Sequence, residues 1–166
     1  GLTLFSPVIK YASRYAIQSF EKNRSYSVLV IITEGIINDM QDTIDALVDA
    51  SRLPLSIILV GIKDKKLFET NSVIENRIKS EMSILNSFND KNVGCNKSVD
   101  ESNKNASSQN LQLISRNGRK MERNVVKFVL FDDSKSDDWN TFEILKDVPS
   151  QLVEWTEMNG IKSYNA

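Results

Sequence analysis

The chain has 166 residues with 21 basic and 22 acidic side chains, and this balance gives no basic surface for nucleic acid or for an anionic membrane. It contains no histidine, which removes the commonest general base and the usual activator of serine and cysteine nucleophiles. Cys95 is the only cysteine, so an internal disulfide and a cysteine zinc cluster are excluded, and a reducing, intracellular compartment is expected. The composition is that of one globular domain and argues against an enzyme.

The first two predicted elements are a helix and a strand. Ser6 followed by Pro7 is a typical helix start, with serine as the N-cap and proline in the first turn. This helix extends to about Phe20 through apolar residues at helical spacing, namely Val8, Tyr11, Ala12, Tyr15 and Ala16. The strand Tyr26–Thr33 follows, and its unbroken apolar run is typical of a strand buried on both faces.

Glu34 comes directly after this strand, where the chain leaves the predicted sheet. Open α/β sheets bind their ligands outside the carboxyl ends of the strands. The residues alone therefore leave two interpretations of Glu34, a metal ligand or an acid in a solvated loop.

A second helix and a second strand follow. Asp39 is the expected N-cap of the helix, whose buried face would carry Met40, Ile44, Leu47, Val48 and Ser51. The opposite face, with Gln41, Asp42, Asp45 and Asp49, is expected to point to solvent. Leu53-Pro54 ends this helix, and Leu55–Gly61 is a second apolar strand. Strand, helix and strand form a parallel unit with a right-handed crossover.

The rest of the chain alternates between apolar and polar segments. A helix is expected over much of Ser72–Phe88, and the polar segment Asn89–Asn110 has too few apolar residues to fold by itself, so we expect a mobile insertion. Val125–Phe131 is a third strand, followed by an acidic connector, "DDSKSDDW". A last helix over about Phe142–Met158, interrupted at Pro149 and capped by Gly160, would pack through Leu152, Val153, Trp155 and Met158.

Four stretches of the chain resemble the copine family, and specifically the second half of its domain, which is related to the von Willebrand factor A fold. These are "GLTLFSPVIKYASRYA", "YSVLVIITEGIINDMQDTIDALVDASRLPLSIILVGI", "RNVVKFVLF" and "VPSQLVEWTEMNGI". The likeness covers most of the chain outside residues 63–115. It implies an α/β fold for residues 1–166: a partial von Willebrand A-like, Rossmann-like parallel sheet of about three strands flanked by helices.

The resemblance also implies a metal site at the carboxyl edge of the sheet. A-type domains bind a divalent ion with an Asp-x-Ser-x-Ser loop, a threonine and a later aspartate. Thr3 matches the threonine, and Glu34 stands where the family usually has aspartate. The serine loop would precede Gly1, so we expect an incomplete site here, with no cofactor in this chain and with Mg or Mn in the intact domain. Gly35, Asn38 and Asp39 are the candidate partner-binding residues beside it.

The function implied by the resemblance is that of a non-catalytic protein-interaction module. Copines bind phospholipid through calcium-dependent C2 domains, which would lie outside this chain, so calcium, membrane contact and recruitment from the cytoplasm to the plasma membrane would belong to a longer protein. The alternatives are a copine-type domain of a RING ubiquitin ligase and a structural oligomerisation domain. Copines proper are favoured by "NDMQDT" and "LPLSI". The protein partner has no signature in the sequence, and no nucleic acid is expected.

The resemblance also predicts where the strand that precedes Glu34 lies in the sheet. The resemblance places Tyr26–Thr33 at an edge of the sheet, beside Leu55–Gly61, with Val125–Phe131 on the far side. Both right-handed crossovers put their helices on one face, so the last helix alone would cover the other. Apolar side chains between Val28 and Ile32 would then meet water, and we expect self-association through the Tyr26–Thr33 edge.

Overall fold

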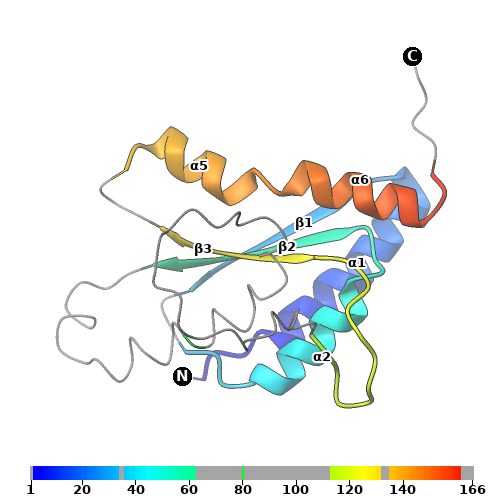
Figure 1. Ribbon diagram of the computed structural model, residues 1–166, viewed down its shortest axis with the longest axis horizontal. Coiled ribbons are helices and arrows are strands. Elements are labelled where there is room, and N and C mark those ends of the chain that lie inside the picture. Colours follow the sequence, from blue (N-terminus) through cyan, green and yellow to red (C-terminus); the bar gives the residue numbers. More distant parts are fainter. Residues whose placement is uncertain (1, 34–35, 63–79, 81–112, 132–134, 162–166) are drawn as a thin grey trace, which may run out of the picture.

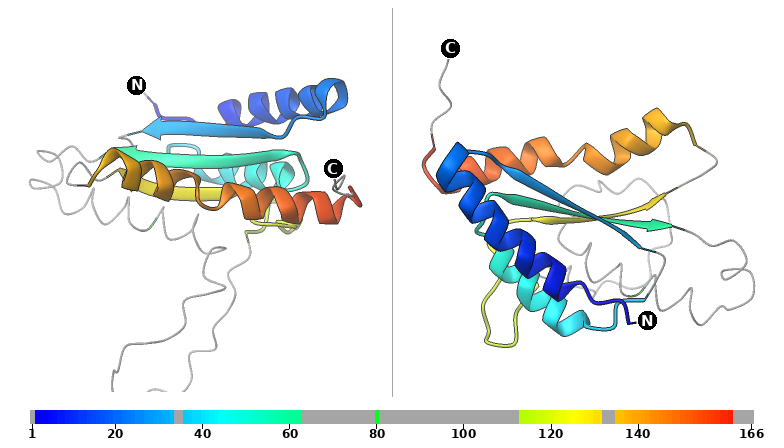
Figure 2. Two further views of the ribbon diagram at one scale, coloured as in Figure 1. Left: turned by 90° about the horizontal axis from the view of Figure 1, so that it is seen from above. Right: turned by 180° about the vertical axis from the view of Figure 1, so that it is seen from behind.

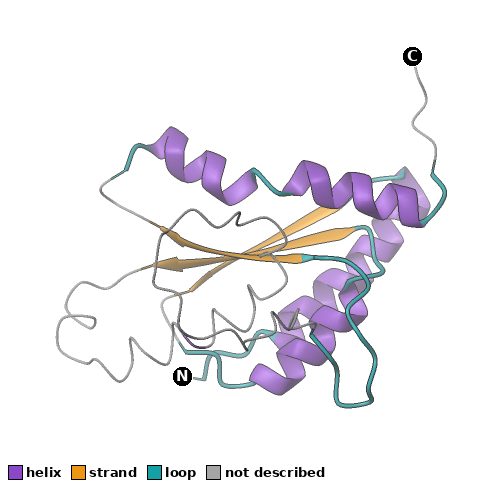
Figure 3. Cartoon of the chain, in the orientation of Figure 1, coloured by secondary structure: helices purple, strands orange, loops and turns teal. Residues whose placement is uncertain are grey.

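The computed structural model describes residues 2–33, 36–62, 80, 113–131 and 135–161 (Figure 1). Three parallel strands form one sheet in the order β1-β2-β3, and helices flank it, which confirms the predicted α/β class (Figure 3). In chain order the elements are α1 (Ser6–Asn23), β1 (Ser27–Thr33), α2 (Met40–Ala50), β2 (Leu55–Ile62), β3 (Val126–Phe131), α5 (Asp137–Leu145) and α6 (Val148–Met158). The helix expected over Ser72–Phe88, the insertion Asn89–Asn110, Glu34, Gly35 and Cys95 lie outside the described residues.

The sheet lies between two helical layers. Helices α1 and α2 lie on one face, and α5 and α6 lie on the other, where they run over β2 and β3 (Figures 1 and 2). The apolar strand β2 is central and is buried along almost its whole length, as its sequence predicts. Among the described residues β1 pairs with β2 alone, so the predicted edge position of this strand is confirmed.

The hydrophobic core fills the layer between the sheet and the helices α1 and α2. Its fully buried members include Ile9, Leu47, Leu55, Ile57 and Leu59. Gly61 is required by this packing, because a Cβ atom at this position would lie 2.6 Å from Cζ of Phe128. The core face predicted for the second helix is confirmed, since Leu47, Val48 and Ser51 are buried and Met40 and Ile44 are half-buried.

The start of α1 differs from the sequence prediction. Ser6 is the first helical residue and is buried, and Phe5 occupies the N-cap position without a capping side chain. The predicted serine cap is therefore wrong. Its role is taken by a carboxylate from a distant part of the chain, Asp39, because that group reaches two amides at the start of the helix.

The predicted last helix is two helices. Ser136 caps α5 by accepting a hydrogen bond from the backbone N–H of Trp139, so Asp137 and Asp138 of the acidic connector lie in the first helical turn. The helical structure is interrupted between Leu145 and Val148. Pro149 lies in the first turn of α6 and does not interrupt a helix. Trp155 is buried as expected and Gly160 follows the helix end with a φ of 63°, but Val153 and Met158 are exposed and do not pack.

A hairpin that sequence reasoning missed covers the polar face of α2. An antiparallel bridge between Ile114 and Lys120 closes the hairpin. The flanking residues Leu113 and Met121 are buried. Arg116 binds Asp45 and Asp42, and Arg119 binds Asp49 at 2.5 Å. The predicted solvent face of α2 is confirmed, since Gln41 and Asp49 are exposed and Asp42 and Asp45 are partly exposed. The arginines of the hairpin form ion pairs with these aspartates at the surface.

Candidate functional site

Thr3 and Asn38, two of the predicted site residues, lie together beside the carboxyl end of the sheet. The backbone N–H of Thr3 donates to Oδ1 of Asn38 at 2.8 Å, and the N–H of Asn38 donates to the carbonyl oxygen of Thr3 at 2.9 Å. This reciprocal pair joins the segment before α1 to the loop before α2. It fixes the backbone of Thr3 beside this loop.

Asp39, the next predicted residue, uses both carboxylate oxygens inside the chain. Oδ1 accepts hydrogen bonds from the amide of Phe5 at 2.9 Å and from the hydroxyl of Thr43 at 3.1 Å. Oδ2 accepts from the amide of Ser6 at 2.9 Å. A negative group at a helix N-terminus is favoured by the unpaired amides and by the helix dipole. Asp39 therefore ties α2 to α1.

The structure thus brings Thr3, Asn38 and Asp39 together, while Glu34 and Gly35 lie outside the described residues. Within the described part of the chain, no three acidic, cysteine or histidine residues are placed to hold a metal ion. A hard cation such as Mg²⁺ needs about six oxygen ligands. Because Asp39 is committed to the cap, the described residues do not form such a site by themselves.

The second candidate site is the outer edge of β1. Val28, Val30 and Ile32 are 42%, 44% and 66% exposed, which confirms that apolar side chains of this strand meet water. The amide of Ser27 donates to Pro54 across the β1–β2 ladder, so the alternate residues Val28, Val30 and Ile32 direct their backbone groups to the outer side. These three residues therefore expose both apolar side chains and hydrogen-bonding groups.

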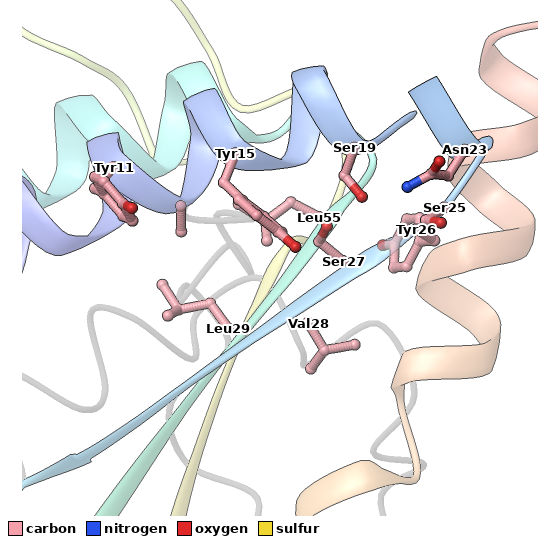
Figure 4. A pocket seen from close by; sticks show the side chains of 11 residues that line it. Tyr11, Tyr15, Ser19, Asn23, Ser25, Tyr26, Ser27, Val28, Leu29 and Leu55 are labelled. Atoms are coloured by element: carbon pink, nitrogen blue, oxygen red, sulfur yellow. The ribbon is translucent and has the colours of Figure 1, made fainter. Parts of the chain in front are cut away.

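A hollow of about 670 Å³ continues this edge towards α1. Tyr11, Tyr15 and Ser19 of α1 line one side of it, and Ser27 and Leu29 of β1 line the other (Figure 4). None of the described residues that line the hollow carries a formal charge. The hollow is therefore an apolar and hydroxyl-lined continuation of the strand edge.

Helix α1 adds an exposed apolar stripe beside the hollow. Its helical members are Val8, Tyr11 and Tyr15, spaced by three and four residues, and the exposed Leu4 precedes the helix. Tyr11 and Tyr15 are 67% and 59% exposed, whereas Ile9 and Ala16 face the core. The apolar periodicity of this segment predicts a helix, which is confirmed, but most of the residues that carry it lie on the outer face. The apolar residues of α1 lie on two faces of the helix, and this pattern in the sequence indicates that one of the two faces is exposed.

Arg123 is a buried charged residue that sequence reasoning did not single out. Its Nη2 atom donates to the carbonyl oxygens of Leu53 and Leu55, both at 2.7 Å, and burial lowers its pKa. Its Nη1 atom reaches the carbonyl oxygen of Gln151 in α6 at 3.4 Å. The guanidinium joins the start of β2 to α6, and this geometry is that of a structural clamp.

Comparison with known proteins relates this arrangement to one family. The copine family model matches residues 1–87. Protein BONZAI 1 of Arabidopsis thaliana is 34% identical over 164 residues, which cover 98% of this chain and 23% of that protein. Copine-D of Dictyostelium discoideum is 29% identical over 160 residues, 96% of this chain and 24% of that protein. Nicotinic receptor-associated protein 1 of Caenorhabditis elegans is 41% identical over 75 residues, 43% of this chain and 12% of that protein.

The chain spans less than a quarter of the length of each of these relatives. Within the described residues, no helix is long and apolar enough to cross a membrane. The matched family model covers more than half of the 166 residues, and the first two relatives align along nearly the whole chain. The parallel sheet, flanked by helices on both faces, is consistent with the A-type fold of that family. The chain belongs to the copine family.

Proposed function

We propose that this chain is a non-catalytic protein-interaction unit of a copine and that the outer edge of β1 pairs with a strand from outside this chain. The observation that carries the proposal is the coincidence, at Val28, Val30 and Ile32, of exposed apolar side chains with outward backbone groups. An edge of this kind binds another chain by strand addition, in which backbone hydrogen bonds give affinity and side-chain pockets give specificity.

Two further observations support a binding role over catalysis. The sequence has no histidine, so a general base near neutral pH would need a strongly shifted pKa at another residue type. The name of the Caenorhabditis elegans relative, nicotinic receptor-associated protein 1, describes that protein by its association with another protein. A binding unit within a longer chain fits both observations.

The membrane and metal functions belong to the wider proposal. In the longer protein, C2 domains would bind phospholipid in the presence of calcium and carry the molecule from the cytoplasm to the plasma membrane. Mg or Mn would be held in the intact domain with Thr3 and Glu34 among its ligands and with further oxygens from outside this chain. The positioning of Thr3 by Asn38 supports this arrangement. Asp39 would act by fixing α1 and α2.

Amide exchange followed by NMR tests the proposed binding edge. At low micromolar concentration, the amides of Val28, Val30 and Ile32 should exchange much faster than those of Leu29 and Ile31, because only the latter two point to β2. Equally slow exchange of both sets at this concentration would show that the chain covers its own edge. That result would contradict the proposal.

A further inference from the structure

We propose that Asn117, at the tip of the hairpin over α2, is a site of self-catalysed deamidation, at which the side-chain amide is lost as ammonia. This site lies in a different part of the molecule from the β1 edge and does not depend on the proposed function. The chain contains two asparagine–glycine pairs, Asn117-Gly118 and Asn159-Gly160, and both lie within the described residues. The surroundings of their side-chain carbonyl groups differ, and this difference carries the inference.

The two glycines are alike in the features that permit the reaction. Deamidation begins when the backbone nitrogen of the following residue attacks Cγ of asparagine, and a glycine has no side chain to obstruct this approach. Gly118 and Gly160 have φ angles of 78° and 63°, and a Cβ atom at either position would have no neighbour within 4 Å. Each amide donates to the carbonyl oxygen three residues before it, Gly118 to Ser115 at 2.9 Å and Gly160 to Glu157 at 3.1 Å. The two pairs are therefore a matched comparison within one chain.

The side-chain carbonyl group of Asn117 is surrounded by hydrogen-bond donors. Its Oδ1 atom accepts hydrogen bonds from the hydroxyl of Ser115, from the backbone N–H of Arg119 at 3.4 Å and from Nε of Arg119 at 3.2 Å. Attack at Cγ moves negative charge onto this oxygen, so donors already directed at it stabilise the transition state as an oxyanion hole does. The guanidinium is the charged donor of the set, and hydrogen bonds from charged donors are the stronger ones.

The side chain of Asn159 is held in a different way. Its Nδ2 atom donates to the carbonyl oxygen of Trp155 at 2.8 Å, at the end of α6. Among the described residues, none donates a hydrogen bond to its Oδ1 atom. The carbonyl group of Asn159 is therefore not polarised by the chain, and the bond to Trp155 retains the nitrogen that must leave.

The reaction at Asn117 needs only water. The backbone nitrogen of Gly118 gives up its hydrogen bond to Ser115, loses its proton to hydroxide and forms a bond to Cγ of Asn117. The bond between Cγ and Nδ2 breaks, and Nδ2 leaves as ammonia after taking up a proton from water, which regenerates the hydroxide. Hydrolysis of the cyclic imide at either carbonyl gives aspartate or isoaspartate. One water is consumed and one ammonia is released, with no oxidation or reduction.

The product changes the hairpin that presents its arginines to α2. The amide of Ser115 donates to the carbonyl oxygen of Arg119 at 2.8 Å and closes the tip, and Arg119 binds Asp49 of α2. Isoaspartate adds one carbon to the backbone inside this closed turn, and either product adds a carboxylate that competes for Arg119. Deamidation therefore weakens the contact between the hairpin and α2.

Incubation of the full chain at neutral pH and physiological temperature, followed by peptide mass spectrometry, tests the inference. We expect Asn117 to lose ammonia about tenfold faster than Asn159 in the folded chain, a smaller ratio than the roughly hundredfold effect of one such donor in a buried active site. In concentrated urea, where the donors no longer surround the carbonyl group, the two rates should be similar.

Two substitutions separate the donor from the ion pair that the same arginine forms. Arg119→Ala removes the Nε donor and should slow the reaction at Asn117 about fivefold, with no change at Asn159. Asp49→Ala is the matched control, because it removes the ion pair with Nη2 of Arg119 and keeps the Nε donor, so the rate at Asn117 should be unchanged. Circular dichroism of each variant verifies folding.

Three results would overturn the inference. Equal rates at Asn117 and Asn159 in the folded chain would show that the donors have no effect. A ratio that persists in urea would place the cause in the neighbouring sequence and not in the fold. Equal slowing by Arg119→Ala and Asp49→Ala would show that attachment of the hairpin sets the rate. None of these results alters the amide exchange expected at β1, so the proposed function is tested separately.

Discussion

Oδ2 of Asp39 accepts the backbone N–H of Ser6 at 2.9 Å, so a residue that precedes α2 caps the first turn of α1. The same carboxylate accepts the amide of Phe5 and the hydroxyl of Thr43. One side chain thereby joins two helices, across the 33 residues that separate Asp39 from Ser6.

Asp39→Ala should destabilise the fold by about 1–2 kcal/mol, because it leaves two helix amides and a buried threonine hydroxyl without their acceptor. Asn38→Ala is the matched control: it removes one exposed side-chain acceptor, and we expect a cost below about 1 kcal/mol. Urea unfolding followed by circular dichroism measures both. Equal costs for the two variants would show that the carboxylate does not couple the helices.

Arg123→Ala should cost about 2–4 kcal/mol, because it removes a fully buried side chain together with both hydrogen bonds that its guanidinium donates to the carbonyl oxygens of Leu53 and Leu55. Arg123→Lys should recover only part of this loss, since a single ammonium cannot reproduce the planar geometry of a guanidinium. Arg119→Ala removes an exposed ion pair with Asp49 and serves as control, with a cost below about 1 kcal/mol. Thermal unfolding compares the three, and a loss for Arg123→Ala no greater than the control would contradict the clamp.

The pKa of Asp45 lies below its ordinary value of 3.8, chiefly because its carboxylate accepts the backbone N–H of Arg116, and secondarily because the Arg116 side chain binds it. The interaction therefore stabilises the fold above pH 3.8, and this stabilisation is lost as the pH falls through the folded pKa. NMR titration of the carboxyl should show a partial rise of its pKa in Arg116→Ala, which keeps the backbone bond. A complete return to 3.8 in that variant would contradict the leading role of the backbone amide.

Gly61→Ala should destabilise the protein by about 1–3 kcal/mol, because the added methyl group would lie 2.6 Å from Cζ of Phe128 and 3.1 Å from Cδ2 of Leu130. The effect should shrink in the double variant Gly61→Ala with Phe128→Leu, since the shorter side chain vacates that space. A double-mutant cycle in urea measures the coupling between the two positions. Additive costs would show that the methyl group is accommodated elsewhere.

The strands could be predicted because their own residues determine them. The apolar runs of β1, β2 and β3 are long enough to mark parallel strands, although alternate residues of β1 are exposed, and their edge and centre positions followed from the family likeness. The hairpin around Gly118 could not be predicted in this way, because its sequence is polar and ion pairs with α2 hold it in place.

The candidate site was predictable in part for a similar reason. The exposed edge of β1 followed from sheet topology, whereas the use of Asp39 as a cap depends on a contact between segments that only the folded chain brings together. The break between α5 and α6 has no glycine or proline at the break itself, and Pro149 fits the first turn of α6. The sequence therefore predicts the interruption at Pro149, a few residues after its actual position between Leu145 and Val148.

The most direct measurement is residue-resolved amide exchange across β1 in the dilute chain. The outward amides of Val28, Val30 and Ile32 should exchange rapidly, while those of Leu29 and Ile31 stay protected. Slow exchange of the outward amides in the dilute chain would mean that β1 is not an open edge, and the binding surface assigned here would be wrong.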